Sequence, residues 1–360
     1  MNPEFLSNEE IVLAARRNLL QGPWDYLVGA SESETTMRRN RLGFDRLGFR
    51  PRVLVDVSRI DPSTSFLGHR LRIPVLLAPI GSLQAFTAEG AVASARAAAE
   101  FGTIPVISSA TQPSLEETAA ASDGPRTFQL YVHGDMDWVR DIVARVKSAG
   151  YAALCLTVDV AMYSRRERPM LSRWITPTQR TRTTTERSYL ASLTWETLDL
   201  IKELWGGPFM VKGVQTAEDA TLAVEHGVDV IWVSNHGGRQ LDHARGTIDT
   251  LPEIVQAVAG RAEIVLDGGI LRGTDVVKAI ALGARAVAIG KLHGWGLAAA
   301  GKYGLVRVLE LLEHEMTVAM GLLGVTCIDQ INANYVCAAE SVTPAHEMSA
   351  WVNMPGARLL

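Results

Sequence analysis

Eight short apolar segments recur along the chain, and most are followed by a segment with the periodicity of an amphipathic helix. The expected strands are residues 74–79, 104–108, 127–132, 152–158, 208–212, 230–234, 263–267 and 286–290. The helices expected between and after them are residues 89–101, 114–121, 135–149, 195–204, 217–226, 251–258, 273–282 and 298–320. Most strand starts lie 22 to 33 residues apart, which is typical of strand–helix units whose parallel strands are buried on both faces. Eight units predict an α/β fold, a (β/α)₈ TIM barrel, within a single domain spanning residues 1–360.

Three parts of the chain depart from this repeat. Residues 1–73 form an expected N-terminal extension that opens with a capping-box pattern at 7–10 and a helix over 11–20. The barrel is expected over 74–322, with a C-terminal tail over 323–360. The fourth and fifth strands start 56 residues apart, so a loop of about 167–195 is inserted between them. Its polar middle lacks periodicity, which fits a disordered loop and a lid over the active face equally well.

Composition narrows the functional classes. A hydrophobic content of 47% with 21% charged residues is ordinary for a globular protein with a large core. A net charge of −4 gives no basic surface for nucleic acid or for a membrane. Because there is no signal-peptide pattern and no long apolar run, we expect a cytoplasmic protein. The cysteines Cys155, Cys327 and Cys337 have no metal-site spacing, so we expect no bound metal, with Cys155 in the core.

Polar and small residues gather where the expected strands end, which is the active face of a (β/α)₈ barrel. They are Pro79, Ile80, Gly81, Ser108, Gln129, Tyr131, Thr157, Asp159, Lys212, Ser234, Asp267, Gly268, Gly269, Gly290 and Lys291. Lys212 closes an apolar strand, where an unpaired ammonium is costly to bury, so we expect an anionic partner and most simply a cofactor. The glycines after the seventh and eighth strands match the recurrent phosphate site of this barrel.

The segment after the sixth strand, residues 234–242, combines His236 with Arg239. A titratable imidazole beside a fixed guanidinium is suited to proton transfer on an anionic ligand. Taken alone, a histidine in such a segment is more often a hydrogen-bonded bystander in a polar loop than a catalytic residue. Its place among eight polar strand ends favours catalysis.

Ser234-Asn235-His236-Gly237-Gly238-Arg239-Gln240 resembles the signature of the FMN-dependent 2-hydroxy acid oxidases and dehydrogenases, the group of glycolate oxidase, lactate oxidase, mandelate dehydrogenase and hydroxymandelate oxidase. The resemblance extends over roughly residues 26–322 and includes motifs on every strand. It implies FMN as the cofactor, an (S)-2-hydroxy acid as the substrate, and O2 or a quinone-like compound as the electron acceptor. It also implies a homo-oligomer, as the family's homotetramers suggest.

The resemblance implies a role for each residue at the strand ends. His236 would be the catalytic base, with Asp159 stabilising its protonated form. Arg166 and Arg239 would bind the substrate carboxylate, and Lys212 would stabilise negative charge on the reduced flavin. Tyr26 and Tyr131 would complete the polar pocket. The residues implied at the flavin ring are Pro79, Ile80, Gly81, Ser108, Gln129, Thr157, Lys212 and Ser234, and those implied at the phosphate are Asp267, Gly268, Gly269, Ile270, Leu271, Gly290 and Lys291.

Two departures from the family pattern concern ligands. Leu271 stands where these proteins usually have an arginine near the phosphate, and Arg272 or Lys291 is expected to replace it. Ala110 stands where the glycolate enzymes carry tryptophan, which implies space for an aryl or mandelate-like substrate unless Tyr163 refills it.

Two other functions are compatible with an FMN barrel. An isomerase or a dehydrogenase of phosphorylated substrates is disfavoured by the arginine pair at 166 and 239, which suits a free carboxylate. A non-catalytic flavin-binding protein is disfavoured by the presence of both His236 and Asp159.

Overall fold

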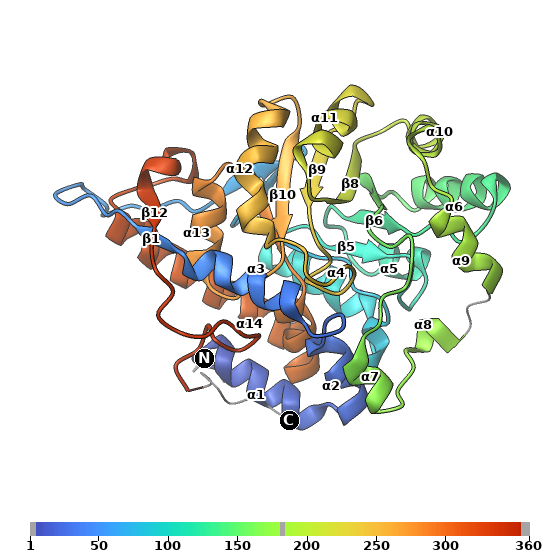
Figure 1. The fold of residues 1–360 in the computed structure, drawn as a ribbon, viewed down its shortest axis with the longest axis horizontal. Coiled ribbons are helices and arrows are strands. Elements are labelled where there is room, and N and C mark those ends of the chain that lie inside the picture. The colour runs from blue at the N-terminus through green and yellow to red at the C-terminus, as the bar shows by residue number, and fades with distance from the viewer. Residues whose placement is uncertain (1–4, 181–183, 354–360) are drawn as a thin grey trace.

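The computed structural model describes residues 5–180 and 184–353, and eight parallel strands form a ring at its centre (Figure 1). The strands are β4 (Val75–Leu77), β5 (Val106–Ser108), β6 (Thr127–Leu130), β7 (Ala153–Thr157), β8 (Phe209–Val214), β9 (Val230–Val233), β10 (Glu263–Asp267) and β11 (Ala286–Ile289). They pair in the order β4-β11-β10-β9-β8-β7-β6-β5, and a bridge between Leu77 and Pro105 joins the two ends. The predicted (β/α)₈ barrel is confirmed.

Helices pack around the outside of the barrel. They are α4 (Ala91–Phe101), α5 (Leu115–Ala120), α6 (Met136–Ser148), α10 (Trp195–Trp205), α11 (Ala217–Glu225), α12 (Thr247–Val258), α13 (Gly273–Ala281) and α14 (Lys291–Leu323). The expected start of the last helix at residue 298 is wrong, because α14 begins directly after Gly290. Its helical backbone is interrupted at Ala300 and Gly301, which is why the sequence pattern shows only its second half.

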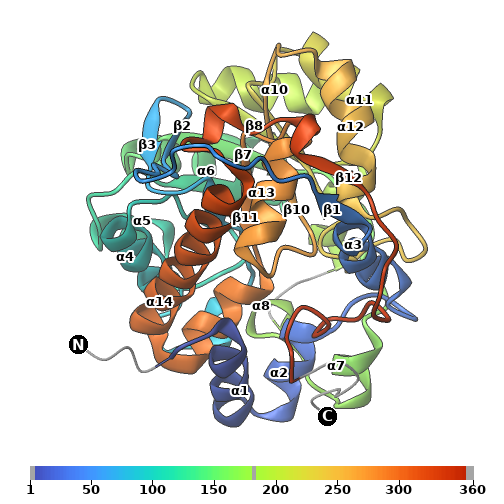
Figure 2. The same cartoon turned by 90° about the vertical axis from the view of Figure 1, so that its left-hand side faces the viewer.

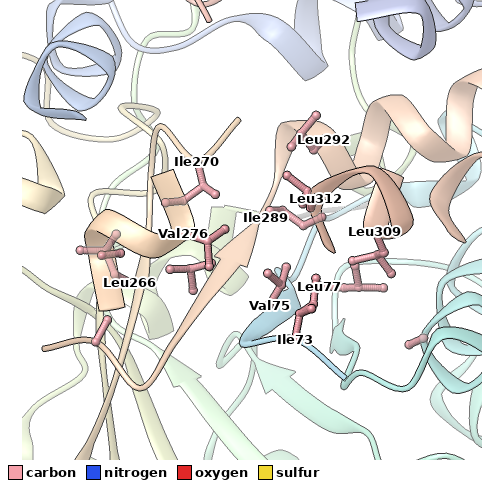
Figure 3. Close-up of a cluster of buried hydrophobic side chains, with 14 of the residues drawn as sticks. Ile73, Val75, Leu77, Leu266, Ile270, Val276, Ile289, Leu292, Leu309 and Leu312 are labelled. Carbon is pink, nitrogen blue, oxygen red and sulfur yellow. The ribbon is translucent and has the colours of Figure 1, made fainter. Parts of the chain in front are cut away.

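Side chains on the barrel strands alternate between two apolar cores. Trp232, Met210 and Cys155 belong to the core inside the barrel, which confirms Cys155 as a core residue. Val75 and Leu77 belong to the core between the strands and the helices. Figure 3 shows this outer core where β4 and β11 meet α14, the junction of the first and the last strand–helix units.

The N-terminal segment contains three helices, α1 (Asn8–Asn18), α2 (Gln21–Val28) and α3 (Thr35–Asp45), and α1 packs against α14. The hydrophobic pattern does not reveal α2 or α3, because α3 is largely polar. Strand β1 (Leu47–Phe49) pairs antiparallel with β12 (Val336–Ala338), so the N- and C-terminal segments meet (Figure 2). A hairpin of β2 (Thr64–Phe66) and β3 (His69–Leu71) adds Phe66 and Leu71 to the inner core. Short 3-10 helices lie at Leu83–Ala85, Ile328–Gln330 and Ala333–Tyr335.

The insertion after β7 contains α7 (Glu167–Leu171), α8 (Pro177–Arg180) and α9 (Thr184–Ala191). Of the two interpretations of the insertion, that of a disordered loop does not hold for these helical stretches, while residues 181–183 lie outside the described residues. Helices of four to eight residues are too short to display a clear apolar period, so the sequence gives little sign of them. Within the described ranges, no helix combines the length and the apolar character that a membrane span requires.

Candidate active site

A cavity opens at the carboxyl ends of the barrel strands, and most of the expected site residues line it. Those that line it are Tyr26, Pro79, Ile80, Gly81, Tyr131, Arg166, Lys212, His236, Arg239, Asp267, Gly268, Gly269, Ile270, Leu271, Gly290 and Lys291. Five other expected residues lie next to this lining. Asp159 bonds to His236, Ser234 bonds to Lys212, and Thr157 pairs with Lys212 across the sheet. Ser108 bonds to Gln129 on the neighbouring strand. The fold therefore brings the whole expected set together.

The turn after β9 has an unusual backbone. His236, Gly237 and Gly238 have φ values of 58°, 67° and 77°, three consecutive residues in the left-handed region. A Cβ on Gly238 would lie 2.5 Å from the backbone N of Met37, so only glycine fits there. A non-glycine residue in this region costs of order 1–3 kcal/mol, and such strain is concentrated at functional sites. The turn directs the His236 side chain into the cavity.

His236 lies in a chain of charged groups. Its Nδ1 lies 2.9 Å from Asp159 Oδ1, and its Nε2 lies 3.5 Å from the Tyr131 hydroxyl. Burial lowers the pKa of His236 below its usual 6.5, although Asp159 opposes the shift. Burial alone would raise the pKa of Asp159, but the charge of Lys212 and the hydrogen bond from His236 help to lower it below its usual value. The pair is therefore a neutral imidazole, oriented by a carboxylate, with Nε2 on the cavity side.

Lys212 is held between two carboxylates. Its Nζ lies 3.8 Å from Asp159 Oδ2 and 3.6 Å from Asp267 Oδ2, and it donates a hydrogen bond to Ser234 Oγ at 2.9 Å. Burial would lower the pKa of Lys212, but the two carboxylates raise it above its usual value. Trp232 from the barrel interior fixes Asp267 by donating its indole N–H at 3.1 Å. A buried positive charge is thus maintained at the cavity.

Arg239 and Arg166 place two guanidiniums at the same cavity. Arg239 Nη1 donates to the carbonyl oxygens of Tyr26 and Gly29, both at 2.6 Å, and Arg166 Nε donates to the Arg239 carbonyl at 3.1 Å. Burial and the neighbouring Arg166 charge lower the pKa of Arg239 to about 10. Among the described residues, no carboxylate oxygen lies within 4 Å of a guanidinium nitrogen of Arg166 or Arg239. The arrangement is suited to an anionic ligand that relieves this repulsion.

Besides the carboxylate oxygens Asp159 Oδ2 and Glu347 Oε2, two buried polar atoms at the strand ends have no hydrogen-bond partner among the described residues. They are Gln129 Nε2 at the end of β6 and Thr157 Oγ1 at the end of β7. Gln129 Oε1 accepts a hydrogen bond from Ser108 Oγ at 2.7 Å, so the amide is fixed with its N–H groups unsatisfied. An unsatisfied buried donor costs about 1–3 kcal/mol. The pair therefore indicates a ligand rich in hydrogen-bonding groups against β6 and β7.

The structure separates the two residues expected to replace the missing arginine at Leu271. Lys291 lines the cavity next to Gly290, where a Cβ would meet nothing within 4 Å. Burial lowers the pKa of Lys291 to about 7. Arg272 is directed away, with Nη1 3.3 Å from Glu315 Oε1 of α14. Of the two, only Lys291 lines the cavity, where its Nζ donates to the Val28 carbonyl at 2.6 Å.

The C-terminal tail closes the cavity beside Lys291, which the sequence does not indicate. Glu347 lines the cavity, and its Oε1 lies 2.6 Å from Arg168 Nη2 of α7. Arg168 also pairs with Glu34 at 2.5 Å. Burial would raise the pKa of Glu347, but Arg168 and Lys291 lower it to about 2. One guanidinium thus joins segments 134 and 179 residues away in sequence, which no local pattern can reveal.

The insertion covers the opposite end of the cavity. Thr178 of α8 donates a hydrogen bond to the Ala110 carbonyl at 2.7 Å, and its hydroxyl lies 2.6 Å from Ser82 Oγ. Trp174 packs against the Tyr26 ring, with centroids 5.4 Å apart. These contacts favour the lid interpretation of the insertion over that of a disordered loop. Part of the space beside Ala110 is thus covered by the lid.

The chain resembles known proteins over most of its length. The family model described as FMN-dependent dehydrogenase matches residues 15–338. An L-lactate oxidase from Nostoc is 42% identical over 89% of this chain and 95% of that protein, and spinach glycolate oxidase is 39% identical over 93% of this chain and 96% of that protein. Among solved structures, a mandelate oxidase superposes with a TM-score of 0.87 at 37% identity, over 94% of this chain and all of that chain. A mutant of an (S)-mandelate dehydrogenase chimera superposes with a TM-score of 0.88 at 34% identity, over 92% of this chain and 99% of that chain.

Proposed function

The chain belongs to the FMN-dependent dehydrogenase family, and from this premise we propose that it oxidises an (S)-2-hydroxy acid to the 2-keto acid with His236 as the base. Like its relatives, it is an FMN-dependent 2-hydroxy acid oxidase or dehydrogenase, an oxidoreductase acting on a CH–OH group. The observation that carries the assignment of roles is the partly buried guanidinium pair beside an imidazole that a carboxylate orients.

The residues of the cavity suit FMN. Gln129 Nε2 and Thr157 Oγ1 offer unused hydrogen-bonding groups to the flavin ring, and Lys212 offers a charge. Gly290 and Lys291 offer an open backbone and a cation to the phosphate. When bound, FMN supplies the acceptor for the two electrons that leave the substrate.

Arg166 and Arg239 bind the substrate carboxylate in this proposal. A carboxylate between them relieves the mutual repulsion that depresses the pKa of Arg239. Since Arg239 is fixed by two backbone carbonyls and Arg166 by the Arg239 carbonyl, their positions are set before substrate binds. Such preorganisation orients the α-carbon without a further entropy cost.

His236 takes a proton from the bound acid through Nε2. The imidazole is neutral before reaction because burial lowers its pKa, and Nδ1–H is held by Asp159. Once Nε2 is protonated, the imidazolium lies beside the Asp159 carboxylate, which stabilises it. The Tyr131 hydroxyl lies 3.5 Å from Nε2, which supports a contact with the same substrate group in this proposal. Lys212 offsets the negative charge that develops on the cofactor side.

We further propose a mandelate-like acid as substrate and O2 as electron acceptor. Solved structures with 37–38% identity include mandelate oxidases, and the small Ala110 leaves apolar space that Tyr163 and Phe86 border. Thr178 limits this space from above, so an aryl ring on the α-carbon is favoured over a long flexible chain. The lactate and glycolate relatives are named as oxidases, which supports O2.

An anaerobic titration of the FMN-loaded protein with glycolate, L-lactate, (S)-mandelate and 2-hydroxyoctanoate tests the proposal. Bleaching of the visible flavin bands, at lowest concentration with (S)-mandelate, is the expected result. Readmitting air should restore the bands and release hydrogen peroxide. If no 2-hydroxy acid bleaches the flavin, the proposed chemistry is wrong. If bleaching occurs but air does not restore the bands, the choice of O2 is wrong.

A further inference from the structure

His293 is a buried histidine that the proposed reaction does not use. It lies in the first turn of α14, and its side chain is 1% exposed. Its Nδ1 lies 3.2 Å from the carbonyl oxygen of Ala78, at the end of β4, and its Nε2 lies 2.7 Å from Ser94 Oγ of α4. Burial lowers the pKa of His293 to about 4, so the ring is neutral at neutral pH.

The two contacts define a single tautomer. A carbonyl oxygen can only accept, so Nδ1 carries the proton and donates to Ala78. Nε2 is then the acceptor for the Ser94 hydroxyl. Both ring nitrogens are satisfied, and the bond to Ala78 depends on a donor at the Nδ1 position.

This histidine joins the first and last strand–helix units of the barrel. Ala78 N already donates to Ile289 O of β11 at 3.0 Å, so the bond from His293 holds the other side of the same residue. The next residue, Pro79, has no N–H with which to anchor the chain. The next backbone anchor on this stretch is the Gly81 carbonyl, which accepts from the Tyr26 hydroxyl at 3.1 Å. The path of residues 79–81 along the cavity therefore depends on how Ala78 is held.

We propose that His293 is a positioning residue that sets the path of residues 79–81 against the FMN ring. The same helical turn contains Lys291, which lines the phosphate end of the cavity, so His293 ties the two ends of the cofactor site together. The inference rests on the proposed placement of the ring against Pro79, Ile80 and Gly81. It concerns how the cofactor is held, and it does not depend on which acid is oxidised.

Two substitutions separate the bonds that His293 makes. In His293→Asn, the side-chain amide nitrogen takes the place of Nδ1 and keeps the bond to Ala78. In His293→Gln, the amide takes the place of Nε2, so the bond to Ser94 is kept and the bond to Ala78 is lost. Ser94→Ala is the matched control, because it removes the Ser94 bond and leaves Nδ1 unchanged.

The measurement is a titration of each apoprotein with FMN, with no hydroxy acid present, followed by the visible absorption spectrum of the bound flavin. Losing one net hydrogen bond of ~1 kcal/mol predicts an FMN dissociation constant about fivefold higher for His293→Gln, with an altered band shape. The Asn variant and the Ser94→Ala control are expected to keep the wild-type dissociation constant and spectrum. Thermal stability should fall in all three, since each loses a buried contact.

Equal FMN affinities for the Asn and Gln variants would overturn the proposal, whether both match wild type or both are weakened. If His293→Gln does not fold, His293→Leu takes its place, because it also lacks a donor to Ala78. FMN affinity equal to that of His293→Asn would then overturn the proposal, and weaker affinity would support it. A wild-type protein that binds FMN but is reduced by no 2-hydroxy acid would refute the proposed function alone, because this comparison uses no substrate.

Discussion

Substituting Asp159 by asparagine removes a charge from the centre of the site and leaves the shape nearly unchanged. The asparagine amide oxygen can still accept the bond from His236 Nδ1, which spans 2.9 Å, so the ring keeps its tautomer and orientation. Lys212 loses a carboxylate at 3.8 Å but keeps Asp267 at 3.6 Å, so its ammonium is not left unpaired. The substitution therefore isolates the electrostatic contribution of Asp159 to the base.

The direction and size of the effect follow from these distances. Asp159 raises the pKa of His236 against the effect of burial, so its loss makes the imidazole a weaker base. A hydrogen bond to a charged group contributes about 1.5–3 kcal/mol, which corresponds to roughly 10- to 150-fold in rate. Two unit charges near 4 Å apart attract by at most ~4 kcal/mol with an effective dielectric constant of 20. The attraction between the imidazolium and the Asp159 carboxylate therefore allows a rate effect near the upper end of this range.

The assay is anaerobic stopped-flow reduction of the bound flavin at saturating (S)-mandelate, with FMN content as the control for an intact site. We expect Asp159→Asn to bind FMN normally and to be reduced on the order of 100-fold more slowly. A rate within about threefold of wild type, in a variant with full FMN content, would refute the view that the Asp159 charge stabilises the imidazolium.

Three further predictions concern the base, the carboxylate and the phosphate. Since His236 must be neutral to accept a proton and burial lowers its pKa, kcat/KM should fall with acid only below pH 6.5; a half-maximal point above 6.5 in the pH profile would contradict this. Arg239→Lys keeps the charge but loses the guanidinium fork held by Tyr26 and Gly29, so kcat/KM in steady-state assays should fall about 10- to 150-fold; an unchanged value would refute the carboxylate contact. Lys291→Gln should weaken FMN binding about tenfold or more, while its riboflavin binding changes little. Arg272→Gln is the control, because Arg272 pairs with Glu315, and it should change the binding of neither flavin. An equal loss of FMN and riboflavin affinity in Lys291→Gln would exclude a phosphate role for Lys291.

The barrel was predictable from the sequence because each strand is a short apolar run buried on both faces. The carboxyl ends of parallel strands share one face, so the residues that follow the strands were predicted to meet, and they do. The cost of burying Lys212 correctly predicted an anionic partner, but the partners in the structure are Asp159 and Asp267 of the chain itself rather than a cofactor. This part of the site follows from local patterns combined with a single topological rule.

Contacts between distant segments could not be predicted in this way. The ion pairs of Arg168 with Glu34 and Glu347 join three segments whose order along the chain says nothing of their proximity. The sequence could not separate Lys291 from Arg272, because the separation depends on long-range partners. Arg272 pairs with Glu315 of α14, whereas Lys291 lines the cavity and donates to the Val28 carbonyl. The sequence does not distinguish Thr178 from the other polar residues of the insertion, and only the structure shows that its hydroxyl bonds to the Ala110 carbonyl.

The central claim is that His236 accepts the proton that leaves the substrate, and His236→Ala tests it most directly. Within the described part of the chain, the His236 side chain bonds to Asp159 and Tyr131, neither of which is proposed to contact the flavin ring. The variant should therefore bind FMN and remain yellow. In anaerobic stopped-flow experiments with (S)-mandelate, we expect flavin reduction to be slower by about 10²- to 10⁴-fold, the usual contribution of a general base. Reduction of the His236→Ala protein at the wild-type rate would contradict the account.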